Sequence, residues 1–213
     1  MAKPLIQLAL DSLDFGTTLR LASLAAPSVD ILEIGTPCIK HNGVPLVKAM
    51  RALFPDKKLF VDLKTMDAGE YEATPFYDAG ADICTVLGVA DLSTIKGVVT
   101  AANNHGKQAQ VDLINVPNKA ERAREAAELG AHIIGIHTGI DQQLAGQTPF
   151  ADLNEIVGLG LNVQVSVAGG IKPETVQQVV QSGANIIVVG GAITGSDDPA
   201  AAARKIRELV DAA

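Results

Sequence analysis

The segment "LFVDLKTMDAGE" (residues 59–70) carries three charged side chains at the end of an apolar run that indicates a buried strand. Asp62 and Lys64 are two residues apart, and side chains with this spacing on a strand lie on the same face. Asp67 follows three residues after Lys64. A structural ion pair would also explain Asp62 and Lys64, but buried ion pairs stabilise proteins weakly. We therefore favour a catalytic or binding role for this segment.

Four other apolar runs end in side chains that can bind a cation or transfer a proton: Asp11, Glu33, Asp112 and His137. An imidazole titrates near neutral pH, so His137 is the candidate for proton transfer. The carboxylates of Glu33 and Asp62 are hard oxygen ligands, and no cysteine or paired histidine accompanies them. This donor type suits Mg²⁺ and does not suit a structural zinc site.

Paired glycines follow the last two apolar runs, in "VAGGIKPET" (residues 167–175) and "VVGGAITGSDDP" (residues 188–199). Each pair leaves backbone N–H groups uncovered and leads towards a helical pattern, an arrangement that binds phosphate in many barrels. Tight turns alone would also use glycine, but two pairs in equivalent places favour a phosphate site. Neither segment contains arginine, so binding would depend on the backbone unless Lys172 reaches the phosphate.

Eight short apolar runs alternate with helical patterns, which predicts a parallel sheet with crossover helices. The runs cover residues 5–10, 29–34, 58–63, 82–87, 108–114, 132–137, 162–168 and 185–190. Eight such units favour the α/β class and a single (β/α)8 TIM barrel over residues 1–213. In that fold the C-terminal ends of the strands meet at one mouth, which would bring the candidate residues together.

A local repeat supports the barrel. The segments "DAGADICTV", "ELGAHIIGI" and "QSGANIIVV" share a helix-ending glycine, an alanine, a polar residue and an apolar strand. Any helix-to-strand loop can have this pattern, but together with eight strands it favours a closed barrel over an open sheet. Pro75 lies inside the predicted third helix, where it should shorten or kink that helix.

Composition excludes several classes of partner. The net charge is −7 and the pI is about 5.0, which argues against a nucleic acid or an anionic membrane as partner. The two cysteines, Cys38 and Cys84, are expected to be reduced, as in cytosolic proteins. The first apolar run is too short for a signal peptide or a membrane span. We therefore expect a soluble cytoplasmic protein.

The chain resembles the orotidine 5′-monophosphate decarboxylase superfamily. "DLKTMD" (residues 62–67) matches its D-x-K-x-x-D motif, and "LALD", "LEIGTP", "GIHTGID", "SVAGGI" and "GGAI" resemble its metal-dependent branch. That branch contains hexulose-phosphate synthases and ketogulonate-phosphate decarboxylases. The similarity extends from Leu8 into the last helical pattern, essentially the whole chain.

This resemblance implies a homodimeric barrel that uses Mg²⁺ or Mn²⁺ to act on a phosphorylated ketose through a 1,2-enediolate. Glu33 and Asp62 would hold the metal, and Asp11 and Lys64 would hydrogen-bond substrate oxygens. Asp67 would enter the active site of the partner subunit. The remaining implied residues are His137, which would move the C1 proton, Asp112 in the catalytic set, and Ala168, Gly169, Gly170, Gly190 and Gly191 in the substrate-binding set.

Four positions separate the two activities of this branch. The decarboxylase pattern has Glu, Arg, Thr and Arg where this chain has Asp112, Ile140, Ala168 and Gly191. The resemblance therefore favours aldol condensation of D-ribulose 5-phosphate with formaldehyde, in either direction, over decarboxylation of 3-keto-L-gulonate 6-phosphate. A non-catalytic phosphosugar-binding barrel is less favoured, because the candidate metal ligands, lysine and histidine are all present.

Overall fold

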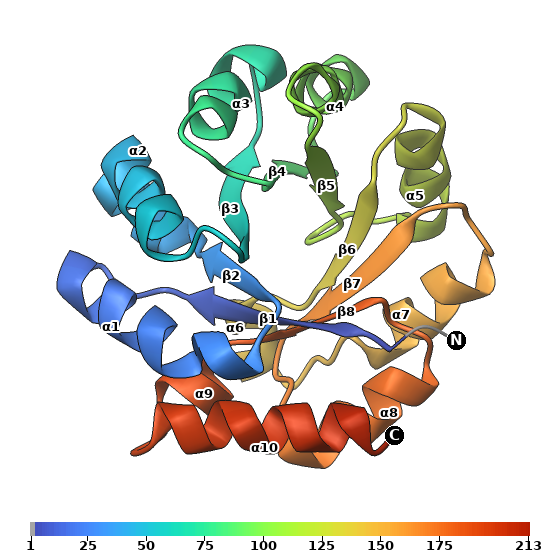
Figure 1. Ribbon diagram of the computed structural model, residues 1–213. Helices are drawn as coiled ribbons and strands as arrows, with labels where there is room; N and C mark the ends of the chain where they lie inside the picture. Colours follow the sequence, from blue (N-terminus) through green and yellow to red (C-terminus); the bar gives the residue numbers. More distant parts are fainter. Residues whose placement is uncertain (1–2) are drawn as a thin grey trace.

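The computed structural model describes residues 3–213 and shows a closed barrel of eight parallel strands in chain order (Figure 1). The strands are β1 (Leu5–Leu10), β2 (Ile31–Ile34), β3 (Lys58–Thr65), β4 (Ile83–Leu87), β5 (Gln108–Asp112), β6 (Ile133–His137), β7 (Gln164–Ala168) and β8 (Ile186–Val189). The predicted TIM barrel and all eight predicted strands are confirmed. Their ends differ from the predicted ends by at most two residues.

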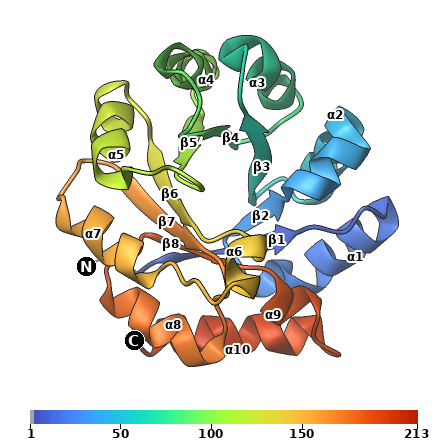
Figure 2. The ribbon, with the colours of Figure 1, turned by 180° about the vertical axis from the view of Figure 1, so that it is seen from behind.

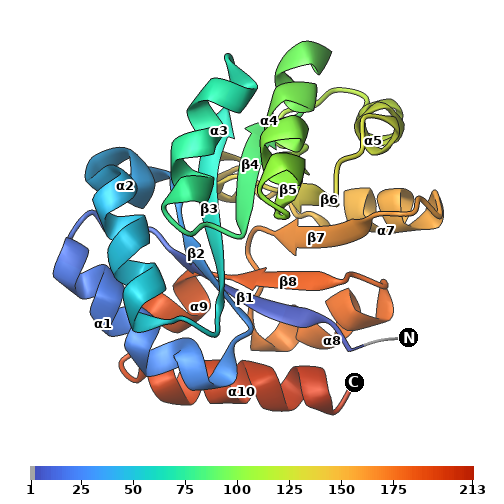
Figure 3. The same cartoon turned by 45° about the horizontal axis from the view of Figure 1, so that its top comes forward.

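Helices cover the outside of the barrel, as the two opposite views in Figures 1 and 2 show. They are α1 (Phe15–Ala25), η1 (Ala26–Ser28), α2 (Thr36–Leu53), α3 (Gly69–Asp78), α4 (Leu92–Asn104), α5 (Lys119–Glu128), α6 (Ile140–Leu144), α7 (Phe150–Gly158), α8 (Pro173–Gln181), α9 (Gly191–Thr194) and α10 (Pro199–Asp211). Lys3 Nζ lies 3.0 Å from Asp211 Oδ1, so the two ends of the described chain meet (Figure 3).

Proline acts differently from the prediction in the third helix. Pro75 does not end α3, which continues for three more residues to Asp78. The carbonyl that loses its N–H partner belongs to Tyr71, an exposed residue. The break occurs in α2 instead, where Gly43 has φ 60° and ψ −160°. Pro45 then lies in the first turn of the second segment, where its missing N–H is not needed.

Two layers of apolar side chains stabilise the fold. Between the barrel and the helices lies a core of Ala, Val, Leu and Ile, to which the free thiols of Cys38 and Cys84 belong. Inside the barrel, the first residues of β2, β4, β6 and β8 form a fully buried isoleucine layer: Ile31, Ile83, Ile133 and Ile186. None of the helices within residues 3–213 combines the length and the apolar character that crossing a bilayer requires.

The next layer of the barrel interior is more polar. It contains the third residue of each odd-numbered strand, namely Gln7, Phe60, Gln110 and Ser166, all of them buried. Barrel interiors are usually filled by branched apolar residues, with alternate strands contributing alternate layers. The polar character of the mouth therefore extends well down into the barrel.

The N-terminal rim of the barrel contains a fourfold repeat of hydrogen bonds. A polar side chain directly before each even-numbered strand accepts the backbone N–H of the second residue of the preceding strand. The four bonds are Ile6 to Asp30 (2.7 Å), Leu59 to Asp82 (2.8 Å), Ala109 to His132 (3.2 Å) and Val165 to Asn185 (2.7 Å). The last three acceptors are the polar residues of the sequence repeat. The polar residue of each repeat therefore accepts the backbone N–H near the start of the preceding strand.

Candidate active site

The C-terminal ends of the strands surround a cavity of about 1100 Å³, over which the short helix α6 projects (Figure 2). Its position agrees with the location of active sites in barrels of this type. All but one of the predicted site residues line it: Asp11, Glu33, Asp62, Lys64, Asp112, His137, Ala168, Gly169, Gly170, Gly190 and Gly191. Ile140, from the set of positions that separate the two activities, also lines the cavity.

Four of these side chains form a continuous chain of hydrogen bonds. Lys64 Nζ lies 2.9 Å from Asp62 Oδ2 and 2.8 Å from Asp112 Oδ2. The same Asp112 oxygen lies 2.9 Å from His137 Nδ1. Burial alone would lower the pKa of Lys64, but Asp112 and Asp62 outweigh burial and raise this pKa above its usual value. Lys64 is therefore a permanent positive charge in the cavity.

The pair Asp112–His137 defines which imidazole nitrogen is free. Burial alone would raise the pKa of Asp112, but the hydrogen bond from His137 and the charge of Lys64 lower it to about 2. An ionised carboxylate only accepts hydrogen bonds, so in the neutral imidazole Nδ1 carries the proton and donates it. The Nε2 atom of His137 is then left unprotonated, as a general base requires.

Lys64 reaches the cavity through an irregular backbone. The register between β3 and β4 shifts between Val61 and Thr65, and Lys64 has φ 47°, in the left-handed region. Thr85 Oγ1 on β4 accepts the Lys64 N–H at 2.9 Å and donates to Asp62 Oδ1 at 2.8 Å. The predicted shared face of Asp62 and Lys64 is confirmed, although a bulge and not regular strand alternation brings the lysine there.

The carboxylates on the β1 and β2 side of the cavity repel one another. Burial and the charge of Asp62 raise the pKa of Glu33 to about 8, against a weaker opposing effect of the Gln7 hydrogen bond. Partial burial and Asp62 also raise the pKa of Asp11. Lys64 is already shared between Asp62 and Asp112. An additional cation would relieve this repulsion.

The donor set fits a hard divalent cation with few protein ligands. Within residues 3–213, no group of three or more His, Cys, Asp or Glu side chains is arranged to hold a metal ion. Glu33 and Asp62 therefore supply two carboxylates at most to an ion between them. Mg²⁺ commonly binds through one or two carboxylates and takes water and substrate oxygens as its other ligands. A structural zinc site would need four protein ligands.

Asp11 depends on a glycine in the next strand-to-helix connection. A Cβ atom added at Gly35, between β2 and α2, would lie only 2.0 Å from Asp11 Oδ1. The Asp11 carboxylate thus packs directly against the backbone of Gly35. The glycine of the "LEIGTP" segment is explained by this contact.

The glycine pairs lie where the sequence predicts a phosphate site. Gly169 and Gly170 have φ 113° and 68°, which favour glycine, and a Cβ on Gly169 would lie 2.4 Å from the carbonyl oxygen of Thr138. Gly190 and Gly191 lead into α9, a short extra helix directly after β8. In barrels this combination of loops and a short helix frequently holds phosphate. Lys172 also lines the cavity, so a cation is available beside the backbone groups.

Asp67 is the predicted site residue that does not line the cavity of its own chain. It is exposed in the connection between β3 and α3, and among residues 3–213 its carboxylate accepts only the neighbouring Ala68 N–H, at 2.7 Å. Within this described part of the chain, Asp67 makes no hydrogen bond to the other site residues. Its predicted role in a partner subunit stays a prediction.

Several polar residues that hold the carboxylates of the cavity were not predicted. Thr36 and Thr85 donate hydrogen bonds to Asp62, and Gln7 donates to Glu33. Gln7 lies on β1, two residues before Ala9 and four before Asp11, which follows the strand, so strand alternation predicts the same face for all three side chains. Thr36 lies two residues after the end of β2, and its position close to a strand end is the signal that could have identified it.

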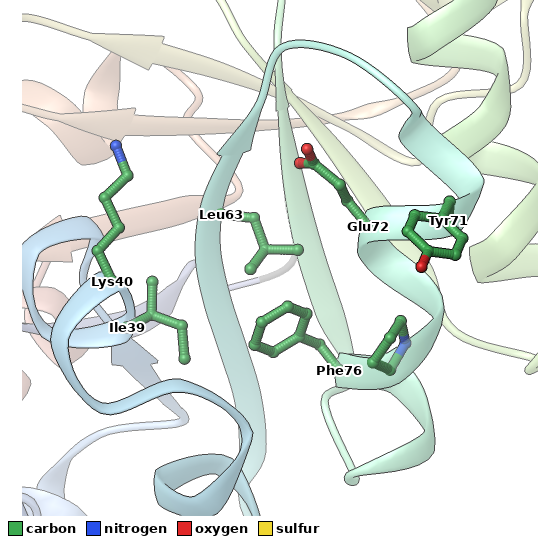
Figure 4. Close-up of a pocket in the computed structure, with 7 residues that line it drawn as sticks. Ile39, Lys40, Leu63, Tyr71, Glu72 and Phe76 are labelled. Carbon is green, nitrogen blue, oxygen red and sulfur yellow. The ribbon is translucent and has the colours of Figure 1, made fainter.

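A second hollow lies on the outside of the barrel. Figure 4 shows this groove between α2 and α3, with a volume of about 490 Å³ and a largely apolar lining that includes Ile39, Leu63 and Phe76. Its charged side chains are Lys40 and Glu72. The groove contains none of the predicted site residues, and the candidate active site is therefore the barrel mouth.

The chain is similar to known proteins over nearly its whole length. Residues 4–206 match the family model described as Orotidine 5'-phosphate decarboxylase / HUMPS family. The chain is 68% identical over 205 residues to a 3-hexulose-6-phosphate synthase of Methylomonas aminofaciens, across 96% of this chain and 98% of the relative.

Two solved structures extend the comparison to the fold. A crystal structure of 3-hexulose-6-phosphate synthase from Salmonella typhimurium is 40% identical, with a TM-score of 0.95 over 98% of this chain and 99% of that chain. A crystal structure of KGPDC from Streptococcus mutans is 28% identical, with a TM-score of 0.93 over 99% of both chains. With a family model that matches nearly its whole length and a relative at 68% identity, this chain belongs to the orotidine 5′-phosphate decarboxylase / HUMPS family.

Proposed function

We propose that this chain is an aldehyde-lyase of the 3-hexulose-6-phosphate synthase type, which joins D-ribulose 5-phosphate and formaldehyde reversibly. The observation that carries the proposal is the His137–Asp112–Lys64–Asp62 chain of hydrogen bonds inside a cavity of about 1100 Å³. The name of the 68% identical relative supports the same reaction. A decarboxylase is the second candidate, supported by more distant structures such as that of KGPDC from Streptococcus mutans at 28% identity.

His137 is the group that removes the C1 proton of the ketose. Asp112 holds its Nδ1 at 2.9 Å, which leaves Nε2 to take the proton. Lys64 faces the negative charge that develops on the substrate oxygen and stabilises it electrostatically. C1 then forms a bond to the formaldehyde carbon, and the former carbonyl oxygen of formaldehyde takes up a proton.

Glu33 and Asp62 are the residues that would hold the metal, with Mg²⁺ proposed and Mn²⁺ as the alternative. When bound, such an ion would polarise the ketose carbonyl and the neighbouring hydroxyl and so acidify the C1 proton. Both Asp62 oxygens already accept hydrogen bonds, from Lys64, Thr36 and Thr85. Asp62 would therefore exchange one of these bonds for the metal.

The substrate phosphate would bind to the glycine loops after β7 and β8, and Asp11 would bind a substrate hydroxyl. The cavity lining at the four positions that separate the activities contains no arginine, since it reads Asp112, Ile140, Ala168 and Gly191. An enzyme that has to guide a substrate carboxylate would be expected to place positive charge there. The lining thus supports the aldol reaction.

The proposed enzyme is a cytoplasmic homodimer in which Asp67 of each chain completes the other active site. Met66 and Tyr71, on either side of Asp67 in the sequence, are 54% and 84% exposed and supply apolar surface that a partner would cover. Tyr71 also lines the groove of Figure 4. Two buried free thiols support a reducing compartment.

The test is to incubate the purified protein with D-ribulose 5-phosphate and formaldehyde, with and without a chelator. We expect loss of formaldehyde that stops when the metal is removed and returns when Mg²⁺ is added. No loss of formaldehyde under any condition, together with CO₂ release from 3-keto-L-gulonate 6-phosphate, would favour the decarboxylase instead. If formaldehyde is still consumed in the presence of the chelator, Glu33 and Asp62 do not hold a metal that the reaction needs.

A further inference from the structure

Gln7 is a polar residue buried beneath the candidate active site. Its side chain comes from the third position of β1, is 1% exposed and lines the floor of the cavity. The amide Nε2 donates a hydrogen bond of 2.7 Å to Glu33 Oε2. Its Oε1 atom is buried and has no hydrogen-bond partner among residues 3–213.

An unpartnered buried carbonyl destabilises a folded protein, because the oxygen loses its bond to water and gains nothing in return. The other such atom in the part of the chain described is Thr65 Oγ1, and Thr65 does not line the cavity. A leucine or methionine at position 7 would fill a barrel interior without this disadvantage. The glutamine is therefore not explained by stability.

The contact with Glu33 explains the orientation of the amide. The amide donates to Glu33 through its nitrogen, so its oxygen points away from this side chain. The bond engages Oε2 of Glu33, and Oε1 of Glu33 makes no hydrogen bond to any other residue within 3–213. One oxygen of the candidate metal ligand is thereby fixed while the other stays available.

We propose that Gln7 is a positioning residue for the metal ligand Glu33, and that its free carbonyl oxygen holds a water molecule at the cavity floor. The inference rests on the metal site of the proposed function. Hydrogen-bond partners behind a metal ligand orient that ligand before the ion arrives, and their loss weakens metal binding. Gln7 touches the ligand and not the reacting atoms, so its effect should appear in metal affinity without substrate.

The experiment measures binding of Mn²⁺ alone by electron paramagnetic resonance of the free ion, in the unchanged protein and in Gln7→Met. Methionine matches glutamine in length but cannot donate a hydrogen bond. We expect the dissociation constant for Mn²⁺ to rise by about 10- to 100-fold. The midpoint of thermal unfolding without metal shows separately whether the substitution changes the stability of the fold. Gln7→Leu serves in the same way if Gln7→Met does not fold.

Gln110→Met is the matched control. Gln110 lies in the same layer of the barrel and is 7% exposed, but its side chain accepts from Ser166 Oγ at 2.9 Å and does not contact Glu33 through a hydrogen bond. We expect this variant to keep the Mn²⁺ affinity of the unchanged protein. If Gln7→Met binds Mn²⁺ as tightly as the unchanged protein, the role of Gln7 is wrong but the metal site stands. The same holds if Gln110→Met loses as much Mn²⁺ affinity as Gln7→Met. Failure of the unchanged protein to bind Mn²⁺ would overturn the metal site itself.

Discussion

Asp112 organises the chemistry at the scale of single residues. Its Oδ2 atom accepts hydrogen bonds from both His137 and Lys64, and its Oδ1 atom accepts the backbone N–H of Ile114 at 2.9 Å. These contacts keep the carboxylate ionised despite its burial, with a pKa of about 2. The base and the stabilising cation are thus oriented by the same group.

Replacement of His137 tests the proton transfer directly. We expect His137→Gln to lower kcat by about 10²- to 10⁴-fold, the usual contribution of general base catalysis. The same variant should lose exchange of the C1 proton of D-ribulose 5-phosphate with D₂O, measured by NMR without formaldehyde. His41→Gln, an exposed position in α2, is the control and should exchange at the unchanged rate. Normal exchange in His137→Gln would assign the base to another residue.

The charged residues of the site could be predicted from the sequence, whereas the residues that hydrogen-bond to them, such as Thr85 and Gln7, were not predicted. Asp62 and Lys64 could be paired from strand alternation, because they lie two residues apart at the end of an apolar run. The left-handed backbone of Lys64 could not, since it depends on the contact with Thr85 of the neighbouring strand. Gln7 was not predicted as a site residue because it lies inside an apolar run and not at its end.

At the scale of elements, the structure explains the polar residue of the sequence repeat, which forms a hydrogen bond at the N-terminal rim of the barrel. The polar residue before each even-numbered strand accepts an N–H group at a strand end, before regular pairing with the next strand begins. Unpaired backbone groups at such ends destabilise a fold. The repeat is therefore a set of strand-end caps at the end of the barrel opposite the active site.

Removal of one cap should lower stability without changing the reaction. We expect Asn185→Ala to reduce the free energy of unfolding by about 1 kcal/mol, the net value of one partly buried hydrogen bond. Urea unfolding followed by circular dichroism measures this change. Asn162→Ala is the comparison, because Asn162 is exposed in the connection that precedes β7. A similar loss in both variants would mean that the Val165 bond is not the cause.

The cap at His132 should make stability depend on pH. Burial lowers the pKa of His132 below its unfolded value near 6.5, and its Nδ1 has to be unprotonated to accept the Ala109 N–H at 3.2 Å. A lowered folded pKa gives stability that is complete above the unfolded pKa and is lost as pH falls towards the folded pKa. His132→Asn keeps an acceptor that does not titrate.

We therefore expect the stability of the unchanged protein, relative to His132→Asn, to decrease between pH 7 and pH 5. Thermal unfolding of both proteins across this range measures the difference and cancels the titration of other groups. A constant difference would show that protonation does not break this cap.

Elements were predictable where their signal is local. The strands follow from apolar runs, and the cap at Asp198 with Pro199 marked the start of α10, where Asp198 accepts the Ala201 N–H at 2.9 Å. The break in α2 was not predictable in the same way. Gly43 and Pro45 are compatible with a loop or with two joined helical segments, and packing against the barrel decides between them.

At the scale of the whole molecule, Asp67 decides whether one chain suffices for activity. If each chain supplies Asp67 to its partner, Asp67→Ala and His137→Gln homodimers should both have little activity. After the two variants are mixed and allowed to exchange subunits, each mixed dimer would contain one complete active site. We expect recovery of about a quarter of normal activity per chain, because half of the dimers are mixed and half of their sites are complete.

The measurement is formaldehyde consumption before and after subunit exchange, with each variant alone as the control. No recovery in a mixture shown by mass spectrometry to contain mixed dimers would exclude a shared site. Full activity of Asp67→Ala alone would remove Asp67 from the mechanism.

The strand-end caps divide the barrel into four tandem modules, since each cap joins two strands that are consecutive in the chain. The described ends of the chain already meet through Lys3 and Asp211. A circular permutant opened between modules, for example at the exposed Gly160 before β7, would keep every cap inside an unbroken piece of chain. Opening within a module would separate a cap from its strand, so tolerance to cutting should alternate around the barrel with a period of two strands.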